Sequence, residues 1–280
     1  MKIKTIAIVG LGLMGGSLAA ACRKKFPAAK IIGVTRSQQA LKDALKKRWI
    51  HEAAQDLVSC ARQADFVVLC TPVDTFAKLL SSFDVAAKPG TIVTDVGSVK
   101  GEVVAWSAKK KFRNIQFVGA HPMVGSHQRG MGAARADLFG RGLTFITKSP
   151  NVSLKAYKTV KNFWKKLSGR VVETTAAAHD QIVAEISHLP HVVAACLVQA
   201  VSQSSIAFAA GGFLDTTRIA QGHSSIWVPI FRANQKAVLK ALSMFENELR
   251  SFKSAVADGD YAKLSQLLAK AAKKRTEITL

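Results

Sequence analysis

Three glycines near the start of the chain have the spacing of a phosphate-binding turn. They form a Gly-x-Gly-x-x-Gly string directly after the apolar run Ile6-Ala7-Ile8-Val9. In such a turn the first glycine permits a tight bend, the second lets the backbone approach a pyrophosphate, and the third lets the next helix pack closely on its strand. The amides at the start of that helix then face the anion. The candidate dinucleotide-binding residues here are Gly10, Leu11, Gly12, Leu13, Met14 and Gly15.

The next strand-like run, Ile31-Ile32-Gly33-Val34, ends at Thr35-Arg36-Ser37. A site that prefers NAD usually has an acidic residue at this point for the ribose hydroxyls. An arginine flanked by two hydroxyls instead suits the additional phosphate of NADP, which a guanidinium binds through paired charge-assisted hydrogen bonds. The structural alternative is a solvated surface arginine. We therefore predict that Thr35, Arg36 and Ser37 bind NADP, with NAD as the second cofactor option.

Three further segments follow strand-like runs. They are Cys70-Thr71-Pro72-Val73, Asp95-Val96-Gly97-Ser98-Val99-Lys100 and Gly119-Ala120-His121-Pro122-Met123-Val124-Gly125-Ser126. In a doubly wound sheet, ligands collect outside the carboxyl ends of the strands, so we expect these segments to line one site. Thr71 and Pro72 are assigned to the cofactor. His121 is suited to proton transfer because the unperturbed pKa of an imidazole lies near neutral pH.

These motifs resemble those of the prephenate/arogenate dehydrogenases of tyrosine biosynthesis, and the likeness runs nearly from end to end. It includes two later segments, Ser187-His188-Leu189-Pro190-His191 and Gly212-Phe213-Leu214-Asp215-Thr216-Thr217-Arg218-Ile219-Ala220. The resemblance implies an oxidative decarboxylation. The ring hydroxyl of prephenate or arogenate is oxidised by hydride loss to the nicotinamide, and carbon dioxide leaves as the ring becomes aromatic.

The resemblance also assigns catalytic roles. His121 matches the family's catalytic histidine, which takes the proton of the substrate hydroxyl. Ser98 matches the serine that orients this histidine and lies near the nicotinamide.

Binding roles follow from the same resemblance, because the substrate carries two carboxylates. Arg218 and His191 match the carboxylate-binding pair, and an arginine can hold a carboxylate with two parallel bonds. His188, three residues before His191, is expected on the same helical face. Ser126 completes the predicted substrate-binding set. The structural alternatives are an ion pair between Arg218 and Asp215, and packing of the two histidines about Pro190.

Two departures from the family pattern leave the substrate open. Family members often have an acidic residue shortly after the His-Pro-Met-x-Gly run, where this chain has Ser126-His127-Gln128-Arg129. They also often carry Ser-Asp-Pro before the tryptophan that matches Trp227, where this chain has Gly222-His223-Ser224-Ser225-Ile226. Arogenate has an ammonium in place of the keto oxygen of prephenate, and a nearby carboxylate would favour it. A histidine at position 127 tilts the prediction towards prephenate.

The elements that position these residues change type part-way along the chain. Strand-like runs alternate with helical segments until about residue 175, which predicts a parallel sheet wound on both faces. The runs are Ile6–Val9, Ile31–Val34, Phe66–Cys70, Thr91–Asp95, Phe117–Ala120, Leu143–Thr147 and Arg170–Thr174, with helices at Ser37–Arg48 and Leu154–Leu167. Later segments are helical only, at His179–Gln203 with a local break at Pro190, at Ser224–Asp258 and at Tyr261–Lys274.

We therefore predict an α/β protein with two domains. Residues 1–175 form a Rossmann-type, doubly wound, dinucleotide-binding domain, and residues 176–280 form an all-helical substrate-binding and dimerisation domain. Small apolar runs such as Ala194-Ala195-Cys196-Leu197-Val198 suggest helices that pack closely on one another or on a second subunit. A homodimer is the expected assembly.

The chain is strongly basic, with a net charge of +22, and residues 1–175 hold 29 Lys and Arg against 10 Asp and Glu. Such a surface could bind nucleic acid, or it could concentrate an anionic cofactor and substrate. The lysines are dispersed without interleaved aromatic residues, so we favour a solvated surface and expect no nucleic-acid partner. Two alternatives remain: a β-hydroxyacid dehydrogenase or pyrroline-carboxylate reductase, and a basic nucleotide-sensing or nucleic-acid-binding protein.

The four cysteines show no Cys-x-x-Cys spacing, so neither a metal site nor a disulfide framework is predicted. No apolar stretch reaches the roughly 18 residues that span a bilayer, and the N-terminus is a strand rather than a secretion signal. We expect a cytoplasmic protein without a membrane partner.

Overall fold

The computed structural model describes residues 3–54, 56–125 and 128–278. The chain divides into two compact units, residues 1–234 and 235–280. They are called unit 1 and unit 2 below, and each is described by itself.

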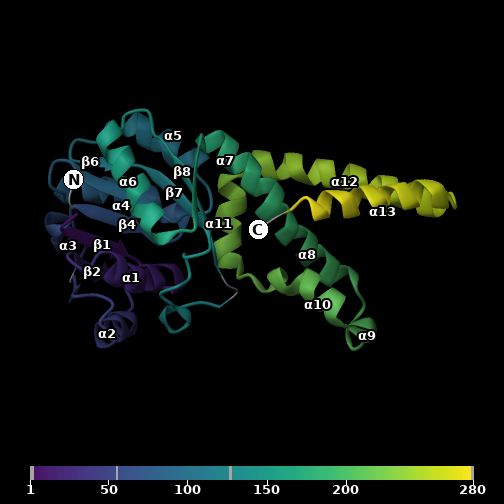
Figure 1. The fold of residues 1–280 in the computed structure, drawn as a ribbon, viewed down its shortest axis with the longest axis horizontal. Helices are drawn as coiled ribbons and strands as arrows, with labels where there is room; N and C mark the ends of the chain where they lie inside the picture. The colour runs from purple at the N-terminus through teal and green to yellow at the C-terminus, as the bar shows by residue number, and fades with distance from the viewer. Residues whose placement is uncertain (1–2, 55, 126–127, 279–280) are drawn as a thin grey trace. The chain divides into compact units, whose positions relative to one another are not determined.

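Unit 1 is built on a parallel six-stranded sheet (Figure 1). The strand order is β3-β2-β1-β4-β5-β6, so the chain starts in the middle of the sheet and crosses over once. The strands are β1 (Thr5–Val9), β2 (Lys30–Val34), β3 (Glu52–Ala53), β4 (Phe66–Leu69), β5 (Thr91–Asp95) and β6 (Ile115–Phe117). This order is that of a doubly wound nucleotide-binding sheet, whose switch point lies between β1 and β4.

Helices cover both faces of this sheet because alternate strand residues point to opposite sides. Ile6 and Ile8 of β1 join one core cluster, with residues of α1 (Leu13–Lys25), α2 (Gln38–Lys46) and α6 (Leu154–Leu167). Ala7 and Val9 join the other, with α3 (Leu57–Gln63), α4 (Phe76–Ala86) and α5 (Gly101–Lys110). The two clusters confirm the predicted winding on both faces.

A second sheet corrects one part of the sequence interpretation. The run Phe117–Ala120 was expected to be one strand, with His121 in the loop after it. Instead β6 ends at Phe117, and β7 (Gly119–Met123) starts a separate three-stranded sheet of order β7-β8-β9. β7 pairs antiparallel with β8 (Leu143–Thr147), which pairs parallel with β9 (Arg170–Thr174). His121 therefore lies in the middle of a strand, opposite Phe145.

The rest of unit 1 is helical in its described part. α7 (Ala176–Val183) and α8 (Leu189–Ala200) are joined by a π-helical turn at Ala184–His188. Pro190 lies in the first turn of α8, where proline is tolerated, so the irregularity precedes the predicted break. Three short helices follow, α9 (Gln203–Ile206), α10 (Gly211–Thr217) and α11 (Ser224–Ala233), with a 3₁₀ turn at Arg218–Gln221.

Unit 2 consists of α12 (Gln235–Ala257) and α13 (Tyr261–Thr276), which pack side by side as a helical hairpin (Figure 1). The predicted single helix Ser224–Asp258 is thus interrupted at Asn234. The side-chain amide of Asn234 donates hydrogen bonds to the main-chain oxygen of Asp180 and to Nδ1 of His188. These bonds satisfy the polar side chain of Asn234, which is buried at the end of α11.

One segment is long and apolar enough to cross a membrane, whereas the sequence analysis expected no such stretch. It is Ala176–Ala200, 25 residues in which α7, the π turn and α8 follow one another, and an 18-residue window of it has a mean hydropathy of 1.4 and is 28% buried. The segment also carries His179, Asp180, His188 and His191, all buried in unit 1. Length and composition alone are weak evidence of a membrane span, because core helices of soluble proteins pass the same test.

Candidate active site

The glycine turn has the geometry of a dinucleotide cradle. Gly10 has a φ of +93°, which favours glycine, and its amide donates to the carbonyl oxygen of Val34 at 2.8 Å. A Cβ on Gly15 would lie 1.8 Å from the carbonyl oxygen of Gly10. A Cβ on Gly12 would meet nothing within 4 Å. The first and third glycines are thus required by packing, whereas the second faces open space, as the close approach of a pyrophosphate demands.

The other predicted cofactor residues lie around this turn at the carboxyl edge of the sheet. A Cβ on Gly10 would approach the methyl group of Thr71 to 3.0 Å, so the loop after β4 borders the turn. The Thr71 hydroxyl shares a 2.7 Å hydrogen bond with that of Thr75. Leu11 is buried, Gly12, Leu13 and Met14 are half-buried, and Pro72 is exposed.

Arg36 is exposed at the end of β2, between a half-buried Thr35 and an exposed Ser37. The Ser37 hydroxyl accepts from the amide of Ala40 at 3.2 Å and so caps α2. A cap of this kind stabilises a helix start by about 1 kcal/mol. Ser37 therefore has a structural role as well as its predicted one.

Asp95, at the end of β5, ties the neighbouring loops together. One carboxylate oxygen accepts from the amide of Gly97 at 2.8 Å, and the other accepts from the amide of Ala120 at 2.9 Å. Lys100 pairs with the same carboxylate, and both side chains are fully buried. Burial raises the pKa of Asp95, opposed by Lys100 and by the backbone donors. This arrangement fixes the start of β7, and hence His121, beside the loop that carries Ser98.

The His121 ring is buried, and the partner recorded for it is a residue that sequence reasoning missed. Its Nδ1 lies 2.9 Å from Nε2 of His179 on α7. Nδ1 of His179 in turn lies 2.8 Å from the Asp180 carboxylate. No hydrogen bond between Ser98 and His121 is recorded among the residues that the structure describes, so the orienting role of Ser98 stays a prediction. The adjacent pair His179-Asp180 at the start of the helical region was the available signal.

Burial is the main cause that lowers the pKa of His121 well below its usual value, and His179, Lys100 and His188 add to it. The same cause lowers the pKa of His179, although Asp180 opposes it. Both rings are consequently neutral at pH 7, which is the state in which an imidazole acts as a base.

The predicted substrate-binding histidines lie together against aromatic rings. His191 stacks on Trp227 with ring centroids 3.6 Å apart, and His188 meets Trp227 edge to face at 6.1 Å. Burial lowers the pKa of His188 to about 4. Nε2 of His188 and Nδ1 of His191 are buried without a hydrogen-bond partner in the described chain. Such atoms are costly unless something else satisfies them, which favours a polar ligand at this place.

Arg218 is exposed at the start of the 3₁₀ turn, and the neighbouring Ile219 is bonded through its backbone to His191. The backbone of this turn therefore contacts His191, and Arg218 is the residue that precedes the contact in the chain. Within residues 3–54, 56–125 and 128–278, no ion pair joins Arg218 to Asp215, and no hydrogen bond joins Arg218 to His121. Ser126, the remaining predicted substrate residue, lies outside the described residues, as does His127.

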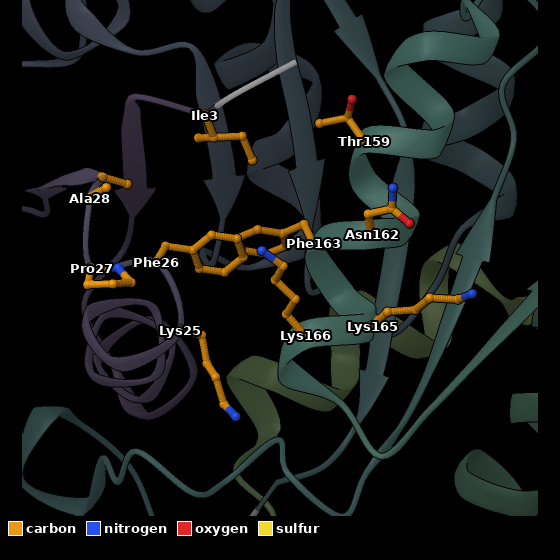
Figure 2. Close-up of a pocket in the computed structure, with 11 residues that line it drawn as sticks. Ile3, Lys25, Phe26, Pro27, Ala28, Thr159, Asn162, Phe163, Lys165 and Lys166 are labelled. Carbon is orange, nitrogen blue, oxygen red and sulfur yellow. The ribbon is translucent and has the colours of Figure 1, made fainter.

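A cavity of about 590 Å³ lies at the opposite edge of the sheet, next to Ile3 and the loop before β2. Figure 2 shows Phe26 and Phe163 on its wall with Lys25, Lys165 and Lys166 around them. The two phenyl rings stack at 5.1 Å, and the Lys166 ammonium lies 5.1 Å from the centroid of Phe26. None of the predicted site residues lines this cavity, so it accounts for some of the basic surface and not for the candidate chemistry.

The described residues lack the side-chain groupings that bind metal ions. In the described part of the chain, no three His, Cys, Asp or Glu side chains are grouped so that they could hold a metal ion.

A doubly wound sheet with this cradle, next to a buried neutral histidine, defines a nicotinamide nucleotide-dependent dehydrogenase. Residues 18–173 match the nucleotide-binding domain model of prephenate dehydrogenase, and residues 175–270 match the dimerization domain model of prephenate dehydrogenase. The chain belongs to the prephenate dehydrogenase family.

Individual relatives agree with this family. The chain is 35% identical to the prephenate dehydrogenase of Bacillus subtilis over 91% of its own length and 71% of that protein. The structure of prephenate dehydrogenase from A. aeolicus in complex with hydroxyphenyl propionate and NAD+ superposes with a TM-score of 0.91 at 30% identity, covering 100% of this chain and 99% of that one. Synechocystis arogenate dehydrogenase gives a TM-score of 0.83 at 30% identity, covering 98% and 99%.

Proposed function

We propose that this protein catalyses the oxidative decarboxylation of prephenate to 4-hydroxyphenylpyruvate, or of arogenate to tyrosine, with a preference for NADP. Its family is that of prephenate dehydrogenases, and the similar solved chains include a prephenate and an arogenate dehydrogenase. The observation that carries the proposal is His121: a buried, neutral imidazole held in β7, whose Ala120 amide donates to Asp95 at the end of β5.

In this reaction His121 takes the proton of the ring hydroxyl. When bound, the nicotinamide supplies the acceptor for the hydride that leaves the hydroxyl-bearing carbon. The electrons of the broken carbon–carboxylate bond enter the ring as carbon dioxide departs. A positioned base of this kind contributes about 10²- to 10⁴-fold to the rate. Ser98 on the loop after β5 is proposed to help orient the histidine beside the nicotinamide.

The two carboxylates of the substrate need fixed donors. We assign them to Arg218 and His191, with His188 and Ser126 as further contacts. The support comes from the 3₁₀ turn that begins at Arg218 and contacts His191 through its backbone, and from the unpartnered buried nitrogens of His188 and His191. An arginine in this position binds a carboxylate through charge-assisted bonds that are roughly twice as strong as neutral ones.

The NADP preference rests on Arg36. The relative from A. aeolicus was crystallised with NAD+, but in this chain an exposed guanidinium follows β2 where an NAD site usually has a carboxylate. The candidate cofactor residues are the glycine turn, Thr35, Arg36, Ser37, Thr71 and Pro72.

We further propose a cytoplasmic homodimer with a dinucleotide-binding domain of residues 1–175 and a helical domain of residues 176–280. The name of the second family model, a dimerization domain, supports the dimer. So do apolar side chains that are exposed in the single chain, among them Ile186 at 58% and Leu214 at 57%. Burial of such side chains on a second copy would remove an exposed apolar surface.

The test is a set of four initial-rate measurements, with prephenate and arogenate each tried with NAD and NADP. The proposal predicts turnover of at least one substrate, with a higher kcat/KM for NADP than for NAD. If neither substrate were oxidised with either cofactor, the function would be wrong. Salt-sensitive binding to DNA without turnover would instead support a nucleic-acid-binding protein.

A further inference from the structure

A chain of three buried side chains ends at the proposed base. Asp180 Oδ1 lies 2.8 Å from Nδ1 of His179, and Nε2 of His179 lies 2.9 Å from Nδ1 of His121. The His179 side chain is fully buried, and its ring meets that of His121 edge to face at 70°. The 2.9 Å between the two ring nitrogens is a hydrogen-bond distance.

The Asp180 carboxylate, at the far end of this series of side chains, accepts hydrogen bonds from the backbone as well. Asp180 Oδ1 also accepts from the backbone amide of Lys100 at 2.8 Å, and Oδ2 accepts from that of Gly101 at 2.7 Å. These amides belong to the start of α5, where unpaired donors favour a negative charge. A carboxylate in such a place is acceptor-only, so the hydrogen of the bond to His179 resides on Nδ1 of His179.

The Asp180 carboxylate determines the tautomer of His179, and the tautomer of His179 then determines that of His121. A neutral histidine carries one ring hydrogen, and in His179 this hydrogen is on Nδ1, so its Nε2 can only accept. The hydrogen between the rings therefore belongs to Nδ1 of His121. With its hydrogen on Nδ1, His121 keeps the lone pair on Nε2. Burial favours this neutral state, and the Lys100 ammonium also disfavours a second proton on His121.

We propose that Asp180 and His179 are positioning residues that hold His121 in the Nδ1-protonated tautomer, so that Nε2 is the atom that takes the substrate proton. This inference rests on the proposed function in one respect only, the identity of His121 as the base. The hydrogen bond to His179 also stabilises His121 once His121 has become an imidazolium, since the Nδ1–H of His121 keeps an acceptor throughout the reaction. The same logic applies wherever a second group fixes which nitrogen of a histidine reacts.

The direct test is nuclear magnetic resonance of the protein with ¹⁵N-labelled imidazole rings. Protonated and unprotonated ring nitrogens resonate far apart, so two-bond ¹H–¹⁵N correlations identify the tautomer of each of the seven histidines. The His121 signals are those lost in the variant His121→Asn. The proposal predicts a hydrogen on Nδ1 of His121 at pH 7. A hydrogen on Nε2 would overturn it.

Two variants extend the test to turnover. His179→Phe keeps an aromatic ring but removes the acceptor from Nδ1 of His121, so the tautomer signal should change. Its kcat should fall by about 100-fold or more, because a base in the wrong tautomer contributes none of its usual 10²- to 10⁴-fold. The KM for substrate and the affinity for the nucleotide should change little. The matched control is Phe145→Leu, since Phe145 meets the His179 ring edge to face at 5.3 Å without a hydrogen bond.

The control should lower the melting temperature and leave the His121 tautomer as in the wild type. If His179→Phe kept the wild-type kcat, or if Phe145→Leu shifted the tautomer equally, the positioning role would be wrong. The resonance measurement needs no substrate, so its result stands even if neither prephenate nor arogenate is turned over. A failure of the inference and a failure of the proposed function are thus distinguishable.

Discussion

Alanine at Gly12 should separate nucleotide binding from stability. A Cβ there meets nothing within 4 Å, and the residue has a φ of −89°, which alanine adopts readily. Gly12 is also the N-cap of α1, where alanine is less favourable than glycine by up to about 1 kcal/mol. For a chain of this size, such a loss lowers the melting temperature by only about 2–4 °C.

Nucleotide binding should suffer much more, because the new methyl group occupies the space through which the pyrophosphate approaches the backbone. Loss of one hydrogen bond to a charged phosphate costs about 1.5–3 kcal/mol. Since about 1.4 kcal/mol corresponds to a tenfold change, Gly12→Ala should weaken NADP binding by roughly 10- to 150-fold.

Gly15→Ala gives the contrasting result. Its Cβ would lie 1.8 Å from the carbonyl oxygen of Gly10, so the start of α1 must move away from the turn. A contact this short puts the cost at the upper end of the about 1–3 kcal/mol that is typical of overpacking, so we expect a melting temperature at least about 6 °C lower together with weak binding.

The assays are titration calorimetry with NADP and thermal unfolding followed by circular dichroism. Gly211→Ala serves as a control, since a Cβ there also meets nothing within 4 Å and the residue lies in α10. Wild-type affinity in Gly12→Ala would refute the assignment of the cradle. A loss of stability in Gly12→Ala as large as in Gly15→Ala would refute the argument from open space.

Three further outcomes follow from the site. Arg36→Gln should weaken NADP binding by about tenfold or more and leave NAD binding nearly unchanged, because only NADP presents a charged phosphate to the residue at position 36. Equal losses of affinity for both cofactors would show that Arg36 does not bind the phosphate. Arg218→Gln should raise the substrate KM far more than it lowers kcat, whereas Arg62→Gln, an exposed arginine on α3, should change neither. The melting temperature should fall as the pH drops from about 6.5 towards 4. The pKa values of His121, His179 and His188 are lowered in the folded chain, so below about pH 6.5 the unfolded chain binds more protons and is favoured. A melting temperature independent of pH in this range would contradict the lowered pKa values.

Local pattern was sufficient for much of the fold. The helix Leu154–Leu167 was predicted with its exact bounds, because its apolar residues recur with helical spacing and a capping Ser153 precedes it. Strands β1, β2, β4 and β5 were predicted within one residue at each end, since buried parallel strands appear as short, continuous apolar runs. The two-residue strand β3 was not predicted, and β6 ends where the predicted run Phe117–Ala120 begins. The glycine turn was equally visible, because its chemistry depends on residues that are adjacent in the sequence.

Features that depend on contacts between residues far apart in the sequence could not be predicted. The run Phe117–Ala120 is apolar throughout, and nothing local marks Val118 as the point where the chain leaves one sheet for another. The bond between His121 and His179 spans 58 residues, so neither its existence nor the tautomer it imposes can be derived from spacing. The π turn at Ala184–His188 was missed for a related reason, as a single wider turn leaves the composition of a helix unchanged.

The most direct test of the account is the rate of hydride transfer in His121→Asn. Stopped-flow absorbance of the reduced nicotinamide, with saturating prephenate and NADP, measures this step, and a separate titration measures nucleotide affinity. We predict a rate lower by about 10²- to 10⁴-fold with the NADP affinity nearly intact. A variant that retained most of the wild-type rate would show that another group takes the proton.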